Sequence, residues 1–152
     1  MSKATILIVE DQRALWEPLQ AALEARDYSV YWVTSATEAM LSLRARNFEF
    51  DIIVLDLMVP LHNVGEDSEF PKGGDGRRGG LILLEKMRAE TDAEIPVVVM
   101  TVVTDPELRK EAGGYAHEVF TKPITLVGLL AAIDRILQSH QIYRHLKGKQ
   151  SP

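Results

Sequence analysis

Five polar side chains stand at or just beyond the C-terminal ends of four short apolar runs. Glu10 and Asp11 follow the first run, Asp56 follows the second, Thr101 the third and Lys122 the fourth. The runs are residues 4–9, 50–55, 95–100 and 119–121. In a parallel α/β sheet the C-terminal ends of the strands gather on one edge, where ligands bind. The sequence therefore predicts one pocket that collects three carboxylates, a hydroxyl and a lysine.

These side chains suit the transfer of a phosphoryl group to an aspartate. The carboxylate of Asp56 is a nucleophile of the kind that forms acyl phosphates. Repulsion between that anion and an anionic phosphoryl group opposes the reaction, and Mg²⁺ removes the repulsion by neutralising charge. Mg²⁺ prefers hard oxygen ligands, which Glu10 and Asp11 supply. Lys122 offers a compact positive charge and Thr101 a hydroxyl donor for the phosphoryl oxygens.

The elements that must position these groups alternate between strand and helix. Strands are expected at the four runs and at residues 29–34, which are β-branched and aromatic. Apolar residues at helical spacing predict a helix after every strand. The predicted helices lie near residues 15–26, 35–43, 81–87, 104–113 and 125–137. Five such βα units predict an α/β fold, a five-stranded doubly wound parallel sheet flanked by helices.

Three residues carry local predictions about the helices. Ser35 and Thr125 are expected to cap the second and the last helix at their N-termini. Pro18 falls inside the first predicted helix, where its ring and missing N–H are expected to kink the helix or delay its start.

Composition limits the class of protein. A chain of 152 residues with 46% hydrophobic and 26% charged residues is expected to form one soluble domain. We place that domain at residues 1–140 and predict a polar tail or linker at 141–152, which would continue the last helix or dock elsewhere. Without cysteine, a signal peptide or a long apolar stretch, we expect a cytoplasmic protein with no membrane contact. The net charge of −5 disfavours direct nucleic-acid binding.

Four motifs resemble the signatures of a response-regulator receiver domain, in the same order. The motifs are residues 6–11 (ILIVED), 54–60 (VLDLMVP), 97–101 (VVVMT) and 120–123 (FTKP). Each motif alone is a weak signal, but the four together are highly specific, and the resemblance covers roughly residues 3–138. The family fold is a five-stranded doubly wound sheet, which agrees with the strand and helix pattern.

The resemblance implies a phosphorylation-controlled switch rather than an enzyme. Asp56 would accept a phosphoryl group from a histidine kinase or a phosphotransfer protein. Thr101 and Lys122 would contact the phosphoryl oxygens and couple phosphorylation to a surface that binds a downstream protein, with a homodimer as a further option. Mg²⁺ would be held by oxygen ligands: the carboxylates of Glu10, Asp11 and Asp56 and the backbone carbonyl of Met58.

The chain departs from the family pattern at three places. Val102 stands where a small residue usually follows the threonine, and its bulk is expected to narrow the approach to Asp56. Val119 takes the place of the usual switch aromatic, and Phe120 is no simple substitute because strand neighbours face opposite sides. Residues 61–80 form a longer, glycine-rich loop, expected to be either a solvated insertion or a lid or docking segment.

Other polar features of the sequence carry no predicted role. Residues 74–79 fit G-x-G-x-x-G, but a dinucleotide site needs these glycines directly after the first strand of a βαβ unit. The histidines show no metal-ligand spacing and are expected at the surface. They are His62, His117, His140 and His145.

Two other functions remain open from the residues alone. One is a receiver-like binding module that is not phosphorylated, for which the departures at Val102 and Val119 leave room. The other is a phosphatase that uses Asp56 as its nucleophile. Haloacid-dehalogenase-like hydrolases require a second aspartate two residues after the nucleophile, where this chain has Met58.

Overall fold

The computed structural model describes residues 3–71 and 76–150, with residues 142–150 as backbone alone. The strands and helices alternate as the sequence predicts. The strands are β1 (Thr5–Val9), β2 (Ser29–Val33), β3 (Ile52–Asp56), β4 (Val97–Thr101) and β5 (Glu118–Thr121). The helices are α1 (Arg13–Glu24), α2 (Ala36–Ala45), α3 (Gly79–Glu90), α4 (Pro106–Gly113) and α5 (Leu126–Gln150), with a short 3₁₀ turn, η1 (Gly76–Arg78), before α3.

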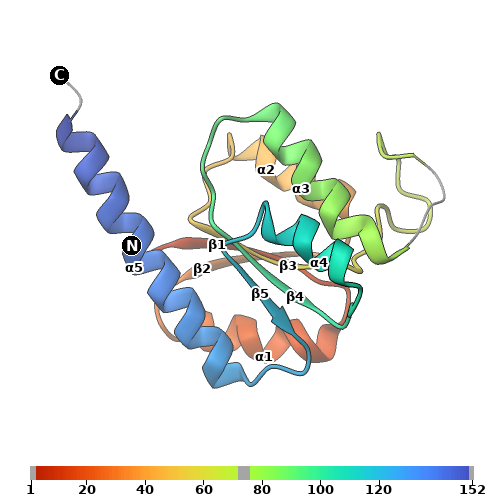
Figure 1. Cartoon of the computed structure of the whole chain (residues 1–152), viewed down its shortest axis with the longest axis horizontal. Coiled ribbons are helices and arrows are strands. Elements are labelled where there is room, and N and C mark those ends of the chain that lie inside the picture. The colour runs from red at the N-terminus through yellow and green to blue at the C-terminus, as the bar shows by residue number, and fades with distance from the viewer. Residues whose placement is uncertain (1–2, 72–75, 151–152) are drawn as a thin grey trace.

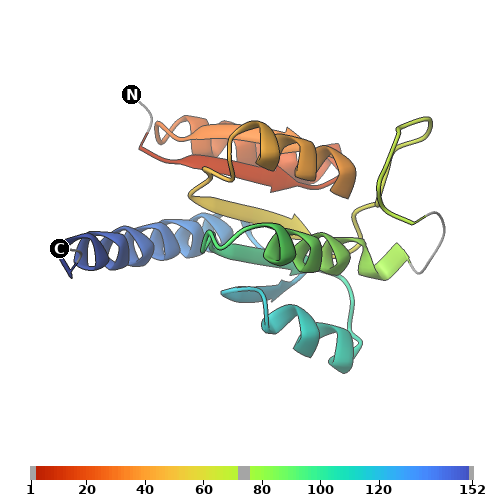
Figure 2. The same cartoon turned by 90° about the horizontal axis from the view of Figure 1, so that it is seen from above.

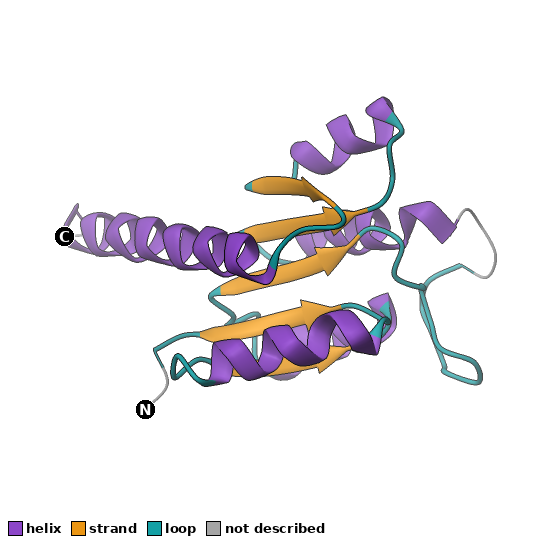
Figure 3. Cartoon of the chain, turned by 90° about the horizontal axis from the view of Figure 1, so that it is seen from below, coloured by secondary structure: helices purple, strands orange, loops and turns teal. Residues whose placement is uncertain are grey.

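The strands form one parallel sheet in the order β2-β1-β3-β4-β5. All arrows point the same way, so the C-terminal ends of the strands share one edge (Figure 3). β3 lies in the middle and all its residues are buried. Its run of Ile, Val and Leu is typical of a strand that helices cover on both sides. The predicted doubly wound α/β fold is confirmed.

Helices cover both faces of the sheet (Figure 1). One buried cluster joins α1 and α5 to alternate strand residues such as Ile6 and Val54, and the other joins α2, α3 and α4 to residues such as Leu7 and Leu55. Because successive strand residues point to opposite faces, each strand contributes to both clusters. The sheet is thereby fixed between two apolar layers, and its C-terminal edge is left for polar groups.

Two of the local helix predictions are confirmed and part of the third is wrong. The Ser35 hydroxyl accepts a hydrogen bond from the Glu38 N–H at 3.1 Å, and the Thr125 hydroxyl accepts one from the Gly128 N–H at 3.0 Å. Helix α1 begins at Arg13, so Pro18 does not delay its start. Pro18 is exposed, and water can therefore satisfy the Ala14 carbonyl that loses its helical partner.

Helix α5 is longer than the helix predicted over residues 125–137. It continues to Gln150 and projects beyond the sheet, so the segment expected as a tail extends the last helix (Figure 1). None of the helices in the described part of the chain combines the length and apolarity needed to cross a bilayer.

Residues 61–71, the described first part of the long loop, are tied to helix α2. The side-chain amide of Asn63 donates to the Glu38 carboxylate at 3.0 Å. The carboxylate of Glu66 accepts hydrogen bonds from the Asn63 N–H at 2.6 Å and from the Ser35 hydroxyl at 3.1 Å. The segment lies beyond the C-terminal ends of the strands (Figure 2). The described part of the loop is therefore anchored to α2, while its tip is exposed at Val64.

The far end of the same segment enters the core. Phe70 is buried in the cluster beneath α2 and α3. Beside it, Glu69 forms ion pairs with Arg44 of α2 at 2.7 Å and with Lys86 of α3 at 3.4 Å. Residues 72–75 lie outside the described part of the chain, and the first glycine of the G-x-G-x-x-G stretch, Gly74, falls among them.

Candidate functional site

Three carboxylates meet at the C-terminal edge of the sheet. Glu10 and Asp11 follow β1, Asp56 ends β3, and these two strands are paired neighbours. One ligand atom from each carboxylate lies within 4.8 Å of the other two. In the described part of the chain this is the one group of three such side chains able to hold a metal ion. The predicted convergence of Glu10, Asp11 and Asp56 is what the fold produces.

Lys122 joins two of these carboxylates. Its Nζ lies 2.9 Å from Oδ2 of Asp56 and 3.0 Å from Oε2 of Glu10. The turn after β5 delivers the lysine, since the Lys122 N–H bonds to the Thr101 carbonyl at 2.9 Å. A salt bridge with so little solvent around it stabilises the fold only if every charge in it has a partner. Lys122 supplies that partner for both buried acids.

Two of the three carboxylates, Glu10 and Asp56, are buried and share one lysine. Glu10 is 0% exposed and Asp56 is 4% exposed, and Lys122 is the cation that pairs with them. Burial raises the pKa of Glu10 above its usual value, and the nearby charge of Asp56 raises it further. Burial acts to lower the pKa of Lys122, but the hydrogen bonds and charges of Asp56 and Glu10 outweigh it and raise that pKa.

Backbone N–H groups bind the carboxylate oxygens of Asp56 and Glu10 that Lys122 does not contact. The Met58 N–H donates to Oδ1 of Asp56 at 3.0 Å, and the Gln12 N–H donates to Oε1 of Glu10 at 3.1 Å. Each buried acid is thus bound by one backbone amide and by the Lys122 ammonium. The backbone of Met58 thus contacts the site through its amide. The predicted role of its carbonyl as a metal ligand remains a prediction.

A pair of glycines brings helix α3 against the Asp56 loop. A Cβ on Gly80 would lie 2.6 Å from the Asp56 carbonyl oxygen, and one on Gly79 would lie 1.9 Å from the Val59 carbonyl oxygen. The Gly80 N–H also donates to the Leu57 carbonyl at 2.9 Å. These glycines therefore allow close backbone packing between α3 and the Asp56 loop.

Thr101 is fully buried at the end of β4. Its hydroxyl oxygen accepts a hydrogen bond from the Val103 N–H at 3.0 Å, which ties it to the loop that leads into α4. The side chain thus stands between the acidic edge and the start of a helix.

The departures from the family pattern have clear places in the structure. Val102 is 55% exposed and lines a cavity of about 330 Å³ beside Lys122 and Pro123. Val119 packs against the core cluster of α2, α3 and α4, and Phe120 packs against that of α1 and α5. The two residues face opposite sides of the sheet, so Phe120 does not stand in for an aromatic at Val119.

The donor set fits a hard divalent cation. Asp11 is exposed while the other two carboxylates are buried, so the cluster is open on one side. Oxygen ligands with two or more negative charges are the environment that Mg²⁺ prefers. We find no comparable gathering of histidines among the described side chains.

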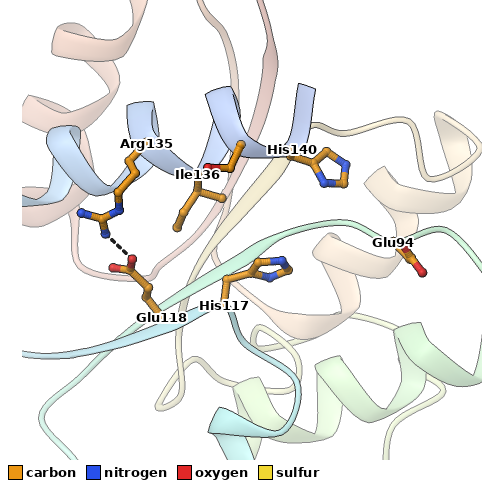
Figure 4. A pocket seen from close by; sticks show the side chains of 7 residues that line it. Glu94, His117, Glu118, Arg135, Ile136 and His140 are labelled. Carbon is orange, nitrogen blue, oxygen red and sulfur yellow. Dashed lines mark hydrogen bonds and ion pairs between the residues drawn. The ribbon is translucent and has the colours of Figure 1, made fainter. Parts of the chain in front are cut away.

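Two of the described histidines lie away from this edge. His117 and His140 line a cavity of about 420 Å³ between the start of β5 and α5, beside the ion pair of Glu118 and Arg135 (Figure 4). That cavity is at the N-terminal ends of the strands, opposite the acidic cluster. His117 is exposed as expected, whereas His140 is half-buried. His62 is also half-buried, and the side chain of His145 lies outside the described residues.

Sequence reasoning missed one contact at the site. Nε1 of Trp32, at the end of β2, donates to the backbone carbonyl of Glu10 at 2.7 Å. A tryptophan in an amphipathic strand carries no signal for this contact, because it depends on the pairing of β1 with β2. The contact between Trp32 and Glu10 can be seen only once β1 and β2 are known to be neighbours.

Comparisons with known proteins agree with the fold and the order of the motifs. No family model matches the chain. The response regulator MprA of Mycobacterium sp. strain KMS is 32% identical over 136 residues, which are 88% of this chain and 50% of MprA. The transcriptional regulatory protein KdpE of Staphylococcus aureus is 29% identical over 143 residues, which are 91% of this chain and 53% of KdpE. The chain spans about half the length of these curated relatives.

Solved structures give the same answer for the fold. A CheY-like receiver domain from Methylobacillus flagellatus matches with a TM-score of 0.65 and 25% identity, covering 89% of this chain and 99% of that one. A CheY-like receiver domain from Methanospirillum hungatei JF-1 matches with a TM-score of 0.72 and 22% identity, covering 93% and 99%. The chain is a response-regulator receiver domain.

Proposed function

We propose that the domain is a phosphorylation-controlled switch that accepts a phosphoryl group on Asp56. The arrangement of the Asp56 carboxylate supports this proposal most directly. Its Oδ2 is paired with Lys122 and its Oδ1 is held by the Met58 N–H, so the nucleophile has a fixed orientation. Glu10 and Asp11 lie within reach of the same carboxylate.

The proposed step is an in-line displacement at phosphorus. An oxygen of Asp56 attacks the phosphoryl group of a phosphohistidine on a histidine kinase or phosphotransfer protein. The new O–P bond forms as the P–N bond breaks, and the electron pair of that bond leaves with the imidazole, which takes up a proton. The product is an aspartyl phosphate, and Lys122 can exchange its carboxylate contact for a phosphoryl oxygen.

A magnesium ion would be held by the carboxylates of Glu10, Asp11 and Asp56 and by the Met58 carbonyl. When bound, it supplies the positive charge that lets two anions approach each other. Glu10 and Asp11 keep that charge beside Asp56, and Lys122 adds its own. The net negative charge of the cluster is the reason for proposing a divalent cation.

The output would be a change in the surface that binds another protein. Thr101 would turn its hydroxyl toward the phosphoryl group and pull on the loop before α4, to which the Val103 N–H already ties it. This biases two arrangements of the later helices. Since Val119 is small, the change would run through this loop and not through an aromatic side chain. A downstream protein or a second copy of the chain would bind that surface.

The test is the intact mass of the protein after incubation with acetyl phosphate and Mg²⁺. We expect the wild type to gain one phosphoryl group, and Asp56→Asn to gain none because its amide is not a nucleophile. Chelating Mg²⁺ should also prevent the gain. An unchanged wild-type mass, also after incubation with active histidine kinases, would contradict the proposal and favour a binding module that is not phosphorylated.

A further inference from the structure

The turn that carries Glu10 and Asp11 is held by strand β2, which gives no side chain to the acidic cluster. The Glu10 N–H donates to the Val33 carbonyl at 3.1 Å. The Glu10 carbonyl accepts a hydrogen bond from Nε1 of Trp32 at 2.7 Å. Any residue at position 33 can supply the first bond, because it uses only the backbone. The second bond depends on the side chain at position 32, because its donor is the indole N–H of Trp32.

The bond from Trp32 restrains the peptide that joins two of the proposed metal ligands. The Glu10 carbonyl belongs to the planar unit between Glu10 and Asp11, so fixing its oxygen fixes the direction in which Asp11 leaves the strand. In the described part of the chain, the Asp11 side chain has no hydrogen bond or ion pair of its own. The backbone therefore determines where the Asp11 Cβ stands, and with it the positions that the carboxylate can reach.

The Trp32 ring is itself braced. Trp16 of α1 stacks on it, with the ring centroids 3.6 Å apart and an angle of 20° between the planes. The Trp16 N–H is buried and has no hydrogen-bond partner among the described residues. The two indoles thus differ in one respect: both take part in the stack, but only the Trp32 N–H reaches the ligand-bearing turn.

We propose that Trp32 is a positioning residue for the divalent cation, holding the Glu10–Asp11 peptide so that both carboxylates face Asp56. The inference rests on the proposed function, since it concerns the cation of that site. Trp32 does not touch the cation. It acts by keeping the ligands assembled before the cation arrives, and the effect of losing it falls on cation affinity.

The test is Mn²⁺ binding, followed by electron paramagnetic resonance, with Mg²⁺ as competitor. Trp32→Phe keeps a ring in the stack and removes the N–H. A net hydrogen bond of ordinary strength corresponds to about two- to tenfold weaker binding. The Mg²⁺ concentration for half-maximal phosphorylation by acetyl phosphate should rise by the same factor, and the rate at saturating Mg²⁺ should stay at the wild-type value.

The matched control is Trp16→Phe, which makes the same change of ring on the other side of the stack. We expect its Mn²⁺ affinity to equal that of the wild type, because no hydrogen bond is lost. Thermal unfolding in a chelator measures the purely structural effect of each change. A positioning role predicts that the two variants differ in cation affinity even where their unfolding temperatures are alike.

Two results would overturn the inference. Equal Mn²⁺ affinity in Trp32→Phe and the wild type would show that the indole N–H does not position the ligands. An equal loss of affinity in both variants would show that the stack merely stiffens the domain. If the wild type itself binds neither Mn²⁺ nor Mg²⁺, the proposed cation site fails, and the failure is then not specific to Trp32.

Discussion

Negative charges outnumber positive charges around Asp56. Two buried acids share one lysine, and the exposed Asp11 adds a further negative charge at the rim. A buried carboxylate without full compensation holds its proton more tightly than usual. The pKa of Glu10 is raised for this reason, with burial as the main cause and Asp56 as the second.

This shift gives a pH dependence to cation binding. Because the pKa of Glu10 lies above 4.5, its carboxylate takes up a proton at a higher pH than an ordinary glutamate. A protonated Glu10 is a poor ligand, so Mg²⁺ affinity should fall as the pH drops toward 4.5. Glu10→Gln should bind Mg²⁺ more weakly near neutral pH and lose less of its affinity on acidification. Wild-type affinity that stays constant down to pH 4.5, measured by calorimetric titration, would contradict this reasoning.

At the scale of single elements, the start of α3 and the end of β3 behave as one unit. The two glycines at the start of the helix allow its backbone to press on the loop that follows Asp56. A longer side chain at either position has no room unless the helix or the loop moves. The position of the proposed phosphoacceptor loop is therefore tied to the position of α3.

Gly80→Ala tests this packing. The added methyl group would lie 2.6 Å from the Asp56 carbonyl oxygen, and we expect a loss of about 1–3 kcal/mol in the free energy of unfolding. Urea denaturation measures it. Gly113→Ala is the control, since a Cβ there meets nothing within 4 Å and alanine favours the helix. Equal stability of Gly80→Ala and the wild type would show that the contact is easily relieved.

The elements differ in how well their sequences predict them. β1, β3 and β4 are nearly continuous apolar runs, and the positions of Glu10, Asp56 and Thr101 follow directly from the strand ends. The hydrogen bonds that anchor residues 61–71 to α2 were not predicted, because they join polar side chains whose contacts depend on tertiary structure. The bond from Trp32 was missed for the same reason: strand order, not strand sequence, brings β2 beside β1.

At the scale of the whole molecule, a polar contact joins the first part of the chain to the last helix. The Tyr28 hydroxyl, just before β2, donates to the Asp134 carboxylate of α5 at 2.8 Å, and Arg26 lies 3.5 Å from the same carboxylate. Burial raises the pKa of Tyr28 to about 12, and the hydrogen bond to Asp134 contributes. The contact lies at the edge of the apolar layer formed by α1 and α5.

The raised pKa predicts a loss of stability in alkali. Between pH 10 and about 12 the unfolded chain ionises Tyr28 while the folded protein keeps its proton there, so the folded state loses its advantage as the pH rises. Tyr28→Phe has no hydroxyl to ionise and should lose less stability over that interval. Urea unfolding of both proteins below pH 10 and near pH 12 gives the comparison. Parallel losses in the two proteins would assign the effect to other groups.

The stacking of Trp16 on Trp32 should constrain which substitutions the two positions accept during evolution. Trp32 serves the acidic turn and Trp16 supports Trp32, although neither is charged and they lie on different elements. A relative that replaces the tryptophan at position 32 has no reason to keep the one at position 16. Among receiver domains that retain both acidic residues after β1, the two aromatic positions should therefore be gained and lost together.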